Sequence, residues 1–189
     1  HHGFVEMIVG PMYSGKSEEL IRRLKRAQIA KQKVQIFKPI LDNRYAEDAV
    51  VSHGGNKISC ESVGESMEIL PLLDPETKVV GIDEVQFFDE NLCEIIEALS
   101  DKGIRVICAG LDMDFRGKPF GIVPRLLSMA EFVDKLTAIC VCCGQPATRT
   151  QRLVDGIPAR FEDETILVGA KEHYEARCRA HHQVAGERR

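Results

Sequence analysis

Short apolar runs alternate along the chain with segments whose apolar residues recur at helical spacing. The short, mostly apolar runs are typical of buried strands and lie at 4–9, 34–37, 79–84 and 104–110. The helical spacing predicts amphipathic helices at 17–31, 92–103 and 126–136. Because strands alternate with helices, we expect an α/β fold: a mostly parallel sheet with helices on both faces.

Two segments depart from this alternation. Residues 42–60 are polar and rich in turn-forming residues, which predicts a loop or a loose hairpin of a length typical of a lid. From about residue 138 the pattern becomes loop-rich. We therefore predict a first domain over 1–138 and a smaller second domain over 139–189.

Composition narrows the class of protein. The 189 residues are 44% hydrophobic, which is enough for one compact core with a small appendage. A net charge of −4 disfavours binding to nucleic acid through phosphate contacts, and we interpret the basic run at 22–26 as a solvated helix face. No apolar run approaches the ~20 residues that span a bilayer, and no signal peptide is visible, so we expect a cytoplasmic protein without membrane contact.

The segment 10–17 fits G-x-x-x-x-G-K-S, the phosphate-binding loop of nucleotide-dependent enzymes. It stands between a predicted strand and a predicted helix, where backbone N–H groups and the helix N-terminus attract phosphate. Lys16 is expected to reach the β- and γ-phosphates, and the Ser17 hydroxyl to ligate Mg²⁺. The candidate phosphate-binding residues are Gly10, Pro11, Met12, Tyr13, Ser14, Gly15, Lys16 and Ser17.

Two acidic residues, Asp83 and Glu84, end the apolar run that follows. An acid at the tip of a strand downstream of a phosphate loop usually lies near Mg²⁺, which is the role predicted for Asp83. Glu84 could then accept a proton from an attacking oxygen. The alternative for Glu84 is an ordinary surface carboxylate. After the next strand, the segment 112–121 mixes acids, bases and aromatic residues, as expected of a wall for a second substrate.

Three of the seven cysteines cluster at 140–143, which favours a metal site in a reducing compartment over a disulfide framework. Cys140-x-x-Cys143 and Cys178-x-x-His181 supply four ligands for tetrahedral Zn²⁺. Four protein ligands leave no open position, so the zinc is expected to be structural. His182 competes with His181 for the fourth place, and a set of free cysteines remains the alternative.

Together these motifs resemble the thymidine kinases of the cellular, zinc-containing type (type II) in their bacterial form. The resemblance runs over nearly the whole chain and is carried by segments in a fixed order. These segments are 10–17, Lys38-Pro39 with 42–45, Ser52-His53, 82–88, 109–112 with 115–121, 135–138, Cys140-x-x-Cys143, 150–152 and 168–170 leading to Tyr174 and Cys178.

The resemblance implies a RecA-like fold with a zinc-bearing lasso domain that covers the nucleoside, and ATP-dependent phosphorylation of the 5′-hydroxyl of thymidine to give dTMP. Glu84 would be the base, with Lys16 and Arg44 at the phosphates. A homotetramer and feedback by dTTP are also implied. The implied nucleoside-binding residues are Met12, Phe87, Leu111, Phe115, Phe120, Thr150 and Tyr174, with backbone groups of Ile166, Leu167, Val168 and Gly169 on the thymine. The family can have Cys at the last metal position, where this chain has His181.

Three other functions share one or more of these motifs. A zinc-ribbon ATPase acting on nucleic acid would use Glu84 to orient water, but the acidic charge balance disfavours it. A GTP-binding switch commonly carries Asn-Lys-x-Asp, whereas the Asn-Lys at 56–57 lacks the Asp. A non-catalytic zinc module is disfavoured by the intact phosphate loop.

Overall fold

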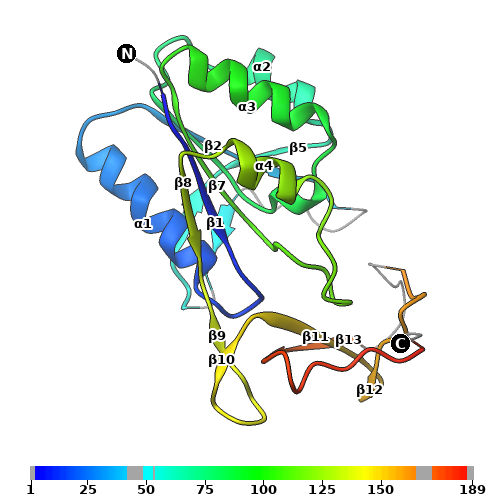
Figure 1. Cartoon of the computed structure of the whole chain (residues 1–189). Coiled ribbons are helices and arrows are strands. Elements are labelled where there is room, and N and C mark those ends of the chain that lie inside the picture. The colour runs from blue at the N-terminus through cyan, green and yellow to red at the C-terminus, as the bar shows by residue number, and fades with distance from the viewer. Residues whose placement is uncertain (1–2, 42–48, 53, 165–171, 187–189) are drawn as a thin grey trace.

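A six-stranded sheet, parallel throughout, forms the centre of the computed structural model, which describes residues 3–41, 49–52, 54–164 and 172–186. In spatial order the strands are β5 (Glu61–Val63), β2 (Val34–Pro39), β6 (Val79–Ile82), β7 (Arg105–Gly110), β1 (Val5–Val9) and β8 (Phe132–Lys135). The predicted apolar runs are therefore strands, and the expected α/β class is confirmed (Figure 1).

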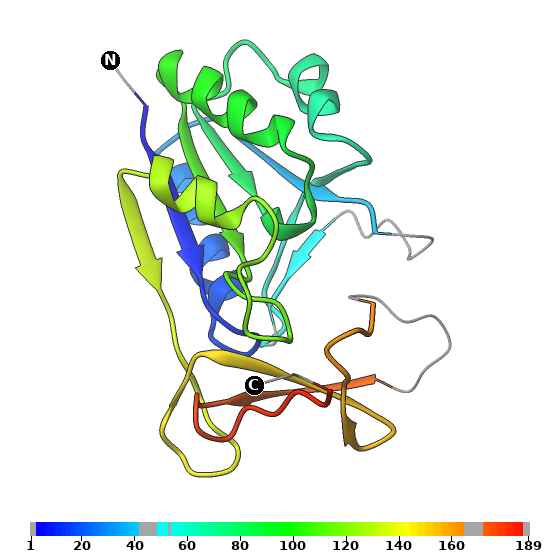
Figure 2. The ribbon, with the colours of Figure 1, turned by 45° about the vertical axis from the view of Figure 1, so that its right-hand side comes forward.

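The helices pack on both faces of this sheet. They are α1 (Lys16–Ile29), α2 (Ile69–Leu72), α3 (Asn91–Asp101) and α4 (Val123–Met129), with 3-10 turns at Ser66–Glu68 and Val85–Phe87. On one face, α1 buries Leu20 and Leu24 in a cluster with Ile107 of the sheet. On the other face, where Figure 2 shows the ribbons of α3 and α4, these helices bury Leu99 and Leu126 in a separate, larger cluster. None of the helices within the described residues is long and apolar enough to cross a membrane.

The predicted helix over 126–136 is wrong in its second half. The helix α4 ends at Met129, Ala130 is extended, and β8 then pairs in parallel with β1. All four residues of β8 are exposed, because this strand lies at the edge of the sheet. An edge strand without a buried face shows no alternation of apolar and polar positions, so the spacing of its residues predicts a continuation of the helix.

The basic run of α1 is not uniformly solvated. Arg22 extends into solvent and pairs with Glu19. Arg23 also pairs with Glu19, but it forms further ion pairs with Glu6 of β1 and Asp134 of β8, and only 14% of its side chain is exposed. This arginine therefore links the helix to two strands of the sheet.

Smaller antiparallel elements complete the chain. A hairpin of β3 (Ala49–Val51) and β4 (Lys57–Ser59) confirms the loose hairpin for the described part of 42–60. After Lys135 the chain forms β9 (Ala138–Ile139), β10 (Pro146–Ala147), β11 (Arg149–Val154), β12 (Ile157–Pro158) and β13 (Glu172–Arg177). We call the parallel sheet with its helices the sheet body, and residues 138–164 with 172–186 the C-terminal lobe. The lobe lies beyond the carboxyl ends of the parallel strands (Figures 1 and 2).

Candidate active site

A cavity of about 410 Å³ lies where the lobe meets the carboxyl ends of β1, β6 and β7. The structure brings to this one cavity all of the nucleoside-binding residues predicted within its described part, from both the sheet body and the lobe. They are Met12, Phe87, Leu111, Phe115, Phe120, Thr150 and Tyr174. From the phosphate loop, Tyr13, Gly15, Lys16 and Ser17 line the same cavity, as does Glu84.

The phosphate loop has the backbone that its sequence motif requires. Gly15 caps α1 in the left-handed region at φ 88°, which glycine adopts without strain. A Cβ on Gly10 would lie 2.6 Å from the carbonyl oxygen of Leu136, so only glycine fits where the loop passes the exit of β8. Tyr13 is left-handed as well, at φ 67°, although it carries a side chain. Such strain is typical of ligand-binding loops.

Lys16 is folded back onto its own loop. Its Nζ donates to the carbonyl oxygen of Pro11 at 2.6 Å, and the Ser14 hydroxyl donates to the same oxygen at 2.7 Å. Burial lowers the pKa of Lys16, whereas the nearby carboxylates of Glu84 and Asp83 act to raise it. The ammonium group is therefore held in a pocket of negative charge, next to the position where a phosphate would lie.

Asp83 and Glu84 occupy the tip of β6. Asp83 is buried, and burial together with the Glu84 carboxylate raises its pKa to about 7. The Glu84 backbone N–H donates to Asp83 Oδ1 at 2.9 Å. Glu84 itself is left-handed at φ 55°, a conformation that costs a residue with a side chain about 1–3 kcal/mol.

This turn aims Glu84 into the cavity, so it is not an ordinary surface carboxylate. Burial raises the pKa of Glu84, while Lys16 and a hydrogen bond from Gln86 act to lower it. The Gln86 amide donates to Glu84 Oε2 at 3.0 Å and accepts from the backbone N–H of Leu111 at 3.1 Å. Gln86 thereby fixes the carboxylate against the neighbouring strand end.

The far side of the cavity is largely apolar. The rings of Phe87 and Phe120 meet edge to face, with centroids 5.5 Å apart. Phe115 adds a third ring, and the guanidinium of Arg152 lies over it, 4.9 Å from its centroid. Aromatic walls of this kind suit a flat, weakly polar ring.

Two hydrogen bonds join the lobe directly to the phosphate loop. The backbone N–H of Met12 donates to Thr150 Oγ1 at 3.1 Å. The hydroxyl of Tyr13 donates to the carbonyl oxygen of Tyr174 at 3.1 Å. The two halves of the cavity are therefore coupled through the loop that would hold the phosphates.

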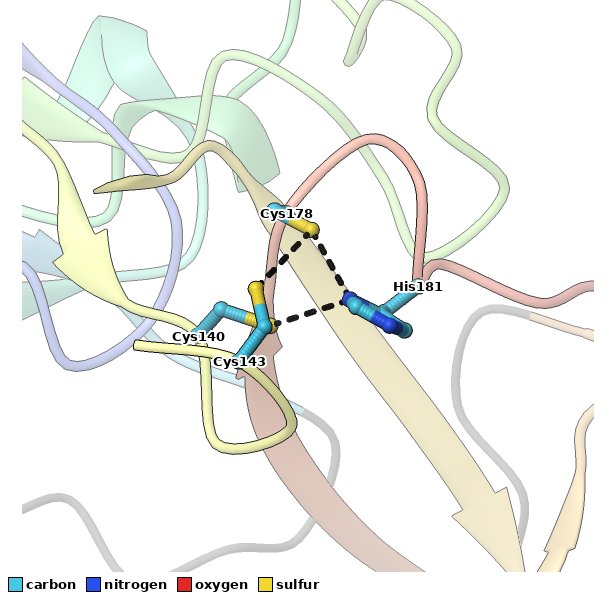
Figure 3. A group of neighbouring side chains, drawn as sticks. All are labelled: Cys140, Cys143, Cys178 and His181. Atoms are coloured by element: carbon cyan, nitrogen blue, oxygen red, sulfur yellow. Dashed lines mark hydrogen bonds between the residues drawn. The ribbon is translucent and has the colours of Figure 1, made fainter. Parts of the chain in front are cut away.

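The four residues of the predicted zinc site lie together at the end of the lobe (Figure 3). The ligand atoms of Cys140, Cys143, Cys178 and His181 all lie within 4.8 Å of one another. Cys143 Sγ is 3.7 Å from Cys178 Sγ, which in turn is 3.2 Å from His181 Nδ1. Zinc–sulfur bonds of about 2.3 Å in a tetrahedron place two sulfurs about 3.8 Å apart, so this cluster could hold a zinc ion.

The competing ligands are turned away from this cluster. His182 donates from Nε2 to the carbonyl oxygen of Phe115 at 2.7 Å and does not join the four. Cys142 is exposed and also lies outside it. Burial acts to raise the pKa of the Cys140 thiol, but backbone N–H groups, led by that of Cys178, outweigh it and lower the pKa to about 6. Such a thiol readily supplies the thiolate that zinc binds.

Five further residues line the cavity without having been predicted: Glu18, Leu41, Ser52, Gln86 and Glu172. A signal existed for one of them. Successive residues of a strand point to opposite faces, so Glu172 shares a face with Tyr174 two positions later. The Tyr174 hydroxyl indeed donates to Glu172 Oε2 at 3.0 Å. No spacing rule in the sequence marked Gln86.

The predicted roles of some residues fall on parts of the chain outside the described residues. They are Arg44 at the phosphates, and Ile166, Leu167, Val168 and Gly169 at the thymine.

Comparison with known proteins agrees with this site. The family model described as Thymidine kinase matches residues 3–182. The match begins just before β1, includes the phosphate loop and Glu84, and extends through the Cys and His cluster. It covers most of the chain, so the resemblance inferred from the motifs is confirmed. The chain belongs to the thymidine kinase family, whose members are kinases that phosphorylate thymidine.

Proposed function

We propose that this chain transfers the γ-phosphoryl group of ATP to the 5′-hydroxyl of thymidine and releases dTMP. The observation that carries the proposal is that residues of a phosphate loop, several aromatic side chains and the Glu84 carboxylate all line one cavity. Phosphoryl transfer depends on alignment and charge neutralisation more than on covalent catalysis, and this arrangement supplies both. The family match supports thymidine as the acceptor.

Glu84 is the general base in this proposal. Its side chain lines the same cavity as the phosphate loop and the aromatic residues, where it could reach the 5′-hydroxyl of a bound nucleoside. A base works best when its pKa is near the working pH, and burial raises the pKa of Glu84 in that direction. Gln86 holds the carboxylate in place by donating to Oε2.

Lys16 has the matching role on the phosphate side. The Nζ that now contacts the Pro11 carbonyl would turn to the β- and γ-phosphate oxygens when ATP binds. Exchange of the carbonyl for phosphate oxygens keeps Nζ hydrogen-bonded and gives the ammonium group an anionic partner. We propose Arg44 as a second cation at the phosphates, on the resemblance alone.

Ser17 and Asp83 would hold the Mg²⁺ that accompanies ATP. Their donor set, a hydroxyl and a carboxylate, suits this cation. Burial beside Glu84 raises the pKa of Asp83, a cost that a nearby divalent cation relieves. The ion would neutralise charge on the transferring phosphoryl group.

The aromatic half of the cavity would bind the thymine base. Met12, Leu111 and the phenylalanine rings form an apolar surface suited to a methylated pyrimidine. Thr150 and Tyr174 close the cavity from the lobe. The backbone of 166–169 as the hydrogen-bonding partner of the base stays a prediction.

Further parts of the proposal rest on the family resemblance. We propose that the zinc is structural, because four protein ligands fill a tetrahedral site. We also propose a division into a nucleotide-binding domain over 1–138 and a zinc-binding lasso domain over 139–189. A homotetramer, feedback by dTTP and a cytoplasmic location complete the proposal.

A phosphorylation assay across the four deoxynucleosides, with ATP and Mg²⁺, tests this function. We expect thymidine to be phosphorylated far faster than the other three, with one ADP formed for each dTMP. Lys16→Ala should abolish turnover while circular dichroism stays unchanged, because the Lys16 ammonium group hydrogen-bonds to Pro11 and Ser14 of its own loop and supports little of the core. ATP hydrolysis that needs no nucleoside would contradict the proposal and favour the zinc-ribbon ATPase.

A further inference from the structure

Arg152, in the middle of β11, is the largest fully buried side chain among the described residues. A guanidinium stays charged at every physiological pH, and burying a charge is costly unless partners compensate it. The lobe around it has little apolar interior, since its buried cluster contains three alanines and Cys140, with Cys178 packed against it. Because burial of this charge is costly and the lobe has little apolar core to offset it, we expect Arg152 to have a role in function.

The guanidinium makes three directed contacts. One Nη atom forms an ion pair with the Glu172 carboxylate, and the other donates to the backbone carbonyl of Glu164. Its plane lies over the Phe115 ring at 4.9 Å. The remaining Nε–H is buried and makes no hydrogen bond within the described residues.

These contacts end on the cavity wall, although Arg152 itself does not line the cavity. Glu172 and Phe115 are both lining residues. Glu172 also connects Arg152 to Tyr174, because its second carboxylate oxygen accepts a hydrogen bond from the Tyr174 hydroxyl. Tyr174 lines the cavity as well. One charged side chain therefore fixes two wall residues directly and a third through Glu172.

We propose that Arg152 is a positioning residue that sets the shape of the nucleoside half of the cavity. It holds the Phe115 ring of the sheet body and the Glu172–Tyr174 pair of the lobe at one fixed separation. The proposal rests on the assignment of this half to the nucleoside. Loss of Arg152 should therefore weaken thymidine binding and leave ATP binding nearly unchanged.

A purely structural role of Arg152 can be told apart from a positioning role. Removing one partner of a buried ion pair is strongly destabilising, whereas replacing both partners by apolar side chains is often neutral or stabilising. Arg152→Met alone should therefore lower the Tm, and the double variant Arg152→Met/Glu172→Met should recover much of it. If Arg152 positions the wall, the double variant regains stability but keeps a high KM for thymidine. If its role is structural only, the KM recovers with the Tm.

The experiment measures KM for thymidine, KM for ATP, kcat and Tm in the full-length zinc-loaded protein. Arg152→Lys keeps the charge but loses the planar fork that serves several partners at once, so it should rescue only partly. Arg160→Met is the matched control, since Arg160 lies in the same lobe and its ion pair with Glu162 is exposed. Surface pairs of this kind contribute little to stability.

For Arg152→Met and for the double variant we expect the KM for thymidine to rise by ~10- to 100-fold, the usual worth of a charge-assisted contact. The KM for ATP should change by no more than about two-fold. Equal changes in both KM values, a fall in kcat alone, or recovery of the KM in the double variant would overturn the proposal. Should Arg152→Met lose its zinc, Glu172→Gln applies the same criteria with the side-chain shape kept. Failure of the wild type to phosphorylate thymidine would instead overturn the proposed function.

Discussion

The sheet body and the C-terminal lobe are stabilised in different ways. The body has two apolar clusters, one on each face of the sheet, filled with large side chains such as Phe37, Ile82 and Leu99. The lobe has a single small cluster, in which no buried side chain is larger than that of Cys140. Full burial of one leucine-sized side chain contributes about 1.5–3 kcal/mol, so the body gains far more from apolar burial than the lobe does.

The lobe compensates with polar and metal-binding groups. Four residues form the candidate zinc site, Arg152 is buried in an ion pair, and hydrogen bonds from Met12 and Tyr13 connect the lobe to the body. Such contacts are directional, so they fix atoms in place more sharply than an apolar core does. We infer that the body maintains the fold and that the lobe sets the geometry of the proposed nucleoside wall.

The largest effect is expected from removal of the metal. Cys143→Ser takes away one of four ligands, and structural zinc sites contribute about 10–16 kcal/mol of apparent binding free energy. The lobe should lose order while the sheet body stays folded, and the KM for nucleoside should rise more than that for ATP. Elemental analysis, with proteolysis at the lobe as a second readout, measures this. Zinc-free protein with normal KM values would show that the lobe does not need the metal to form the nucleoside site.

Glu84→Gln tests the part of the site that the body supplies. The variant keeps shape and hydrogen bonding but cannot accept a proton, so kcat should fall by ~10²–10⁴ while thymidine and ATP still bind. Because burial raises the pKa of Glu84, kcat of the wild type should fall as the pH drops through a value above the usual 4.5, where the base becomes protonated. That acidic limb should disappear in the variant.

The neighbouring residue provides the control for Glu84→Gln. Asp83→Asn should raise the Mg²⁺ requirement and recover in part with excess metal or Mn²⁺, because Asp83 is proposed to handle a cation instead of a proton. Glu84→Gln protein with kcat within a few-fold of wild type would contradict the assignment of the base.

Leu99→Ala tests the apolar core of the body. Leu99 of α3 is fully buried, so the truncation should cost about 2–5 kcal/mol of unfolding free energy without loss of zinc. Ile139→Ala in the lobe is the control, since Ile139 is 72% exposed and should change stability by less than about 0.5 kcal/mol. Urea denaturation measures both. A similar loss of unfolding free energy in the two variants would contradict the conclusion that the body depends on apolar burial more than the lobe does.

His182→Ala should give the smallest effect. The His182 side chain connects the lobe to the loop that carries Phe115. It removes the hydrogen bond from Nε2 to the Phe115 carbonyl, worth about 0.5–1.5 kcal/mol, so the KM for thymidine should rise only a few-fold. Zinc should be retained, whereas His181→Ala should lose it. Metal loss in the His182 variant would show that the fourth ligand has been misassigned.

The parts of the site that sequence could predict are those that depend on local spacing. The phosphate loop, the acids after β6 and the two short pairs of metal ligands each lie within a few residues, where the motif itself dictates the geometry. The choice between His181 and His182 depends on the turn after Cys178, whose carbonyl accepts from both backbone N–H groups. Spacing alone could not decide which ring faces the cluster.

Other features depend on long-range packing and left no local trace. Arg152 lies in a short strand and is fully buried, against the usual exposure of arginine, because Glu172 and Phe115 approach it from elsewhere in the chain. The side chain of Gln86 is held at the cavity by the backbone N–H of Leu111, which follows a different strand and therefore left no signal next to Gln86 in the sequence. The edge strand β8 was missed because all four of its residues are exposed, so no buried face marks it in the sequence; only its pairing with β1 identifies it as a strand.

The strand β13 begins at the cavity with Glu172 and Tyr174 and runs directly into Cys178 of the candidate zinc site. At about 3.3 Å per residue, the distance from Tyr174 to Cys178 along the chain is about 13 Å. A single rigid segment thus spans the metal cluster and the nucleoside wall. Chelators or thiol oxidants in a storage buffer would then raise the apparent KM for thymidine, as a weak competitive inhibitor does. Protein prepared with them would show a low affinity for thymidine that is caused by the buffer.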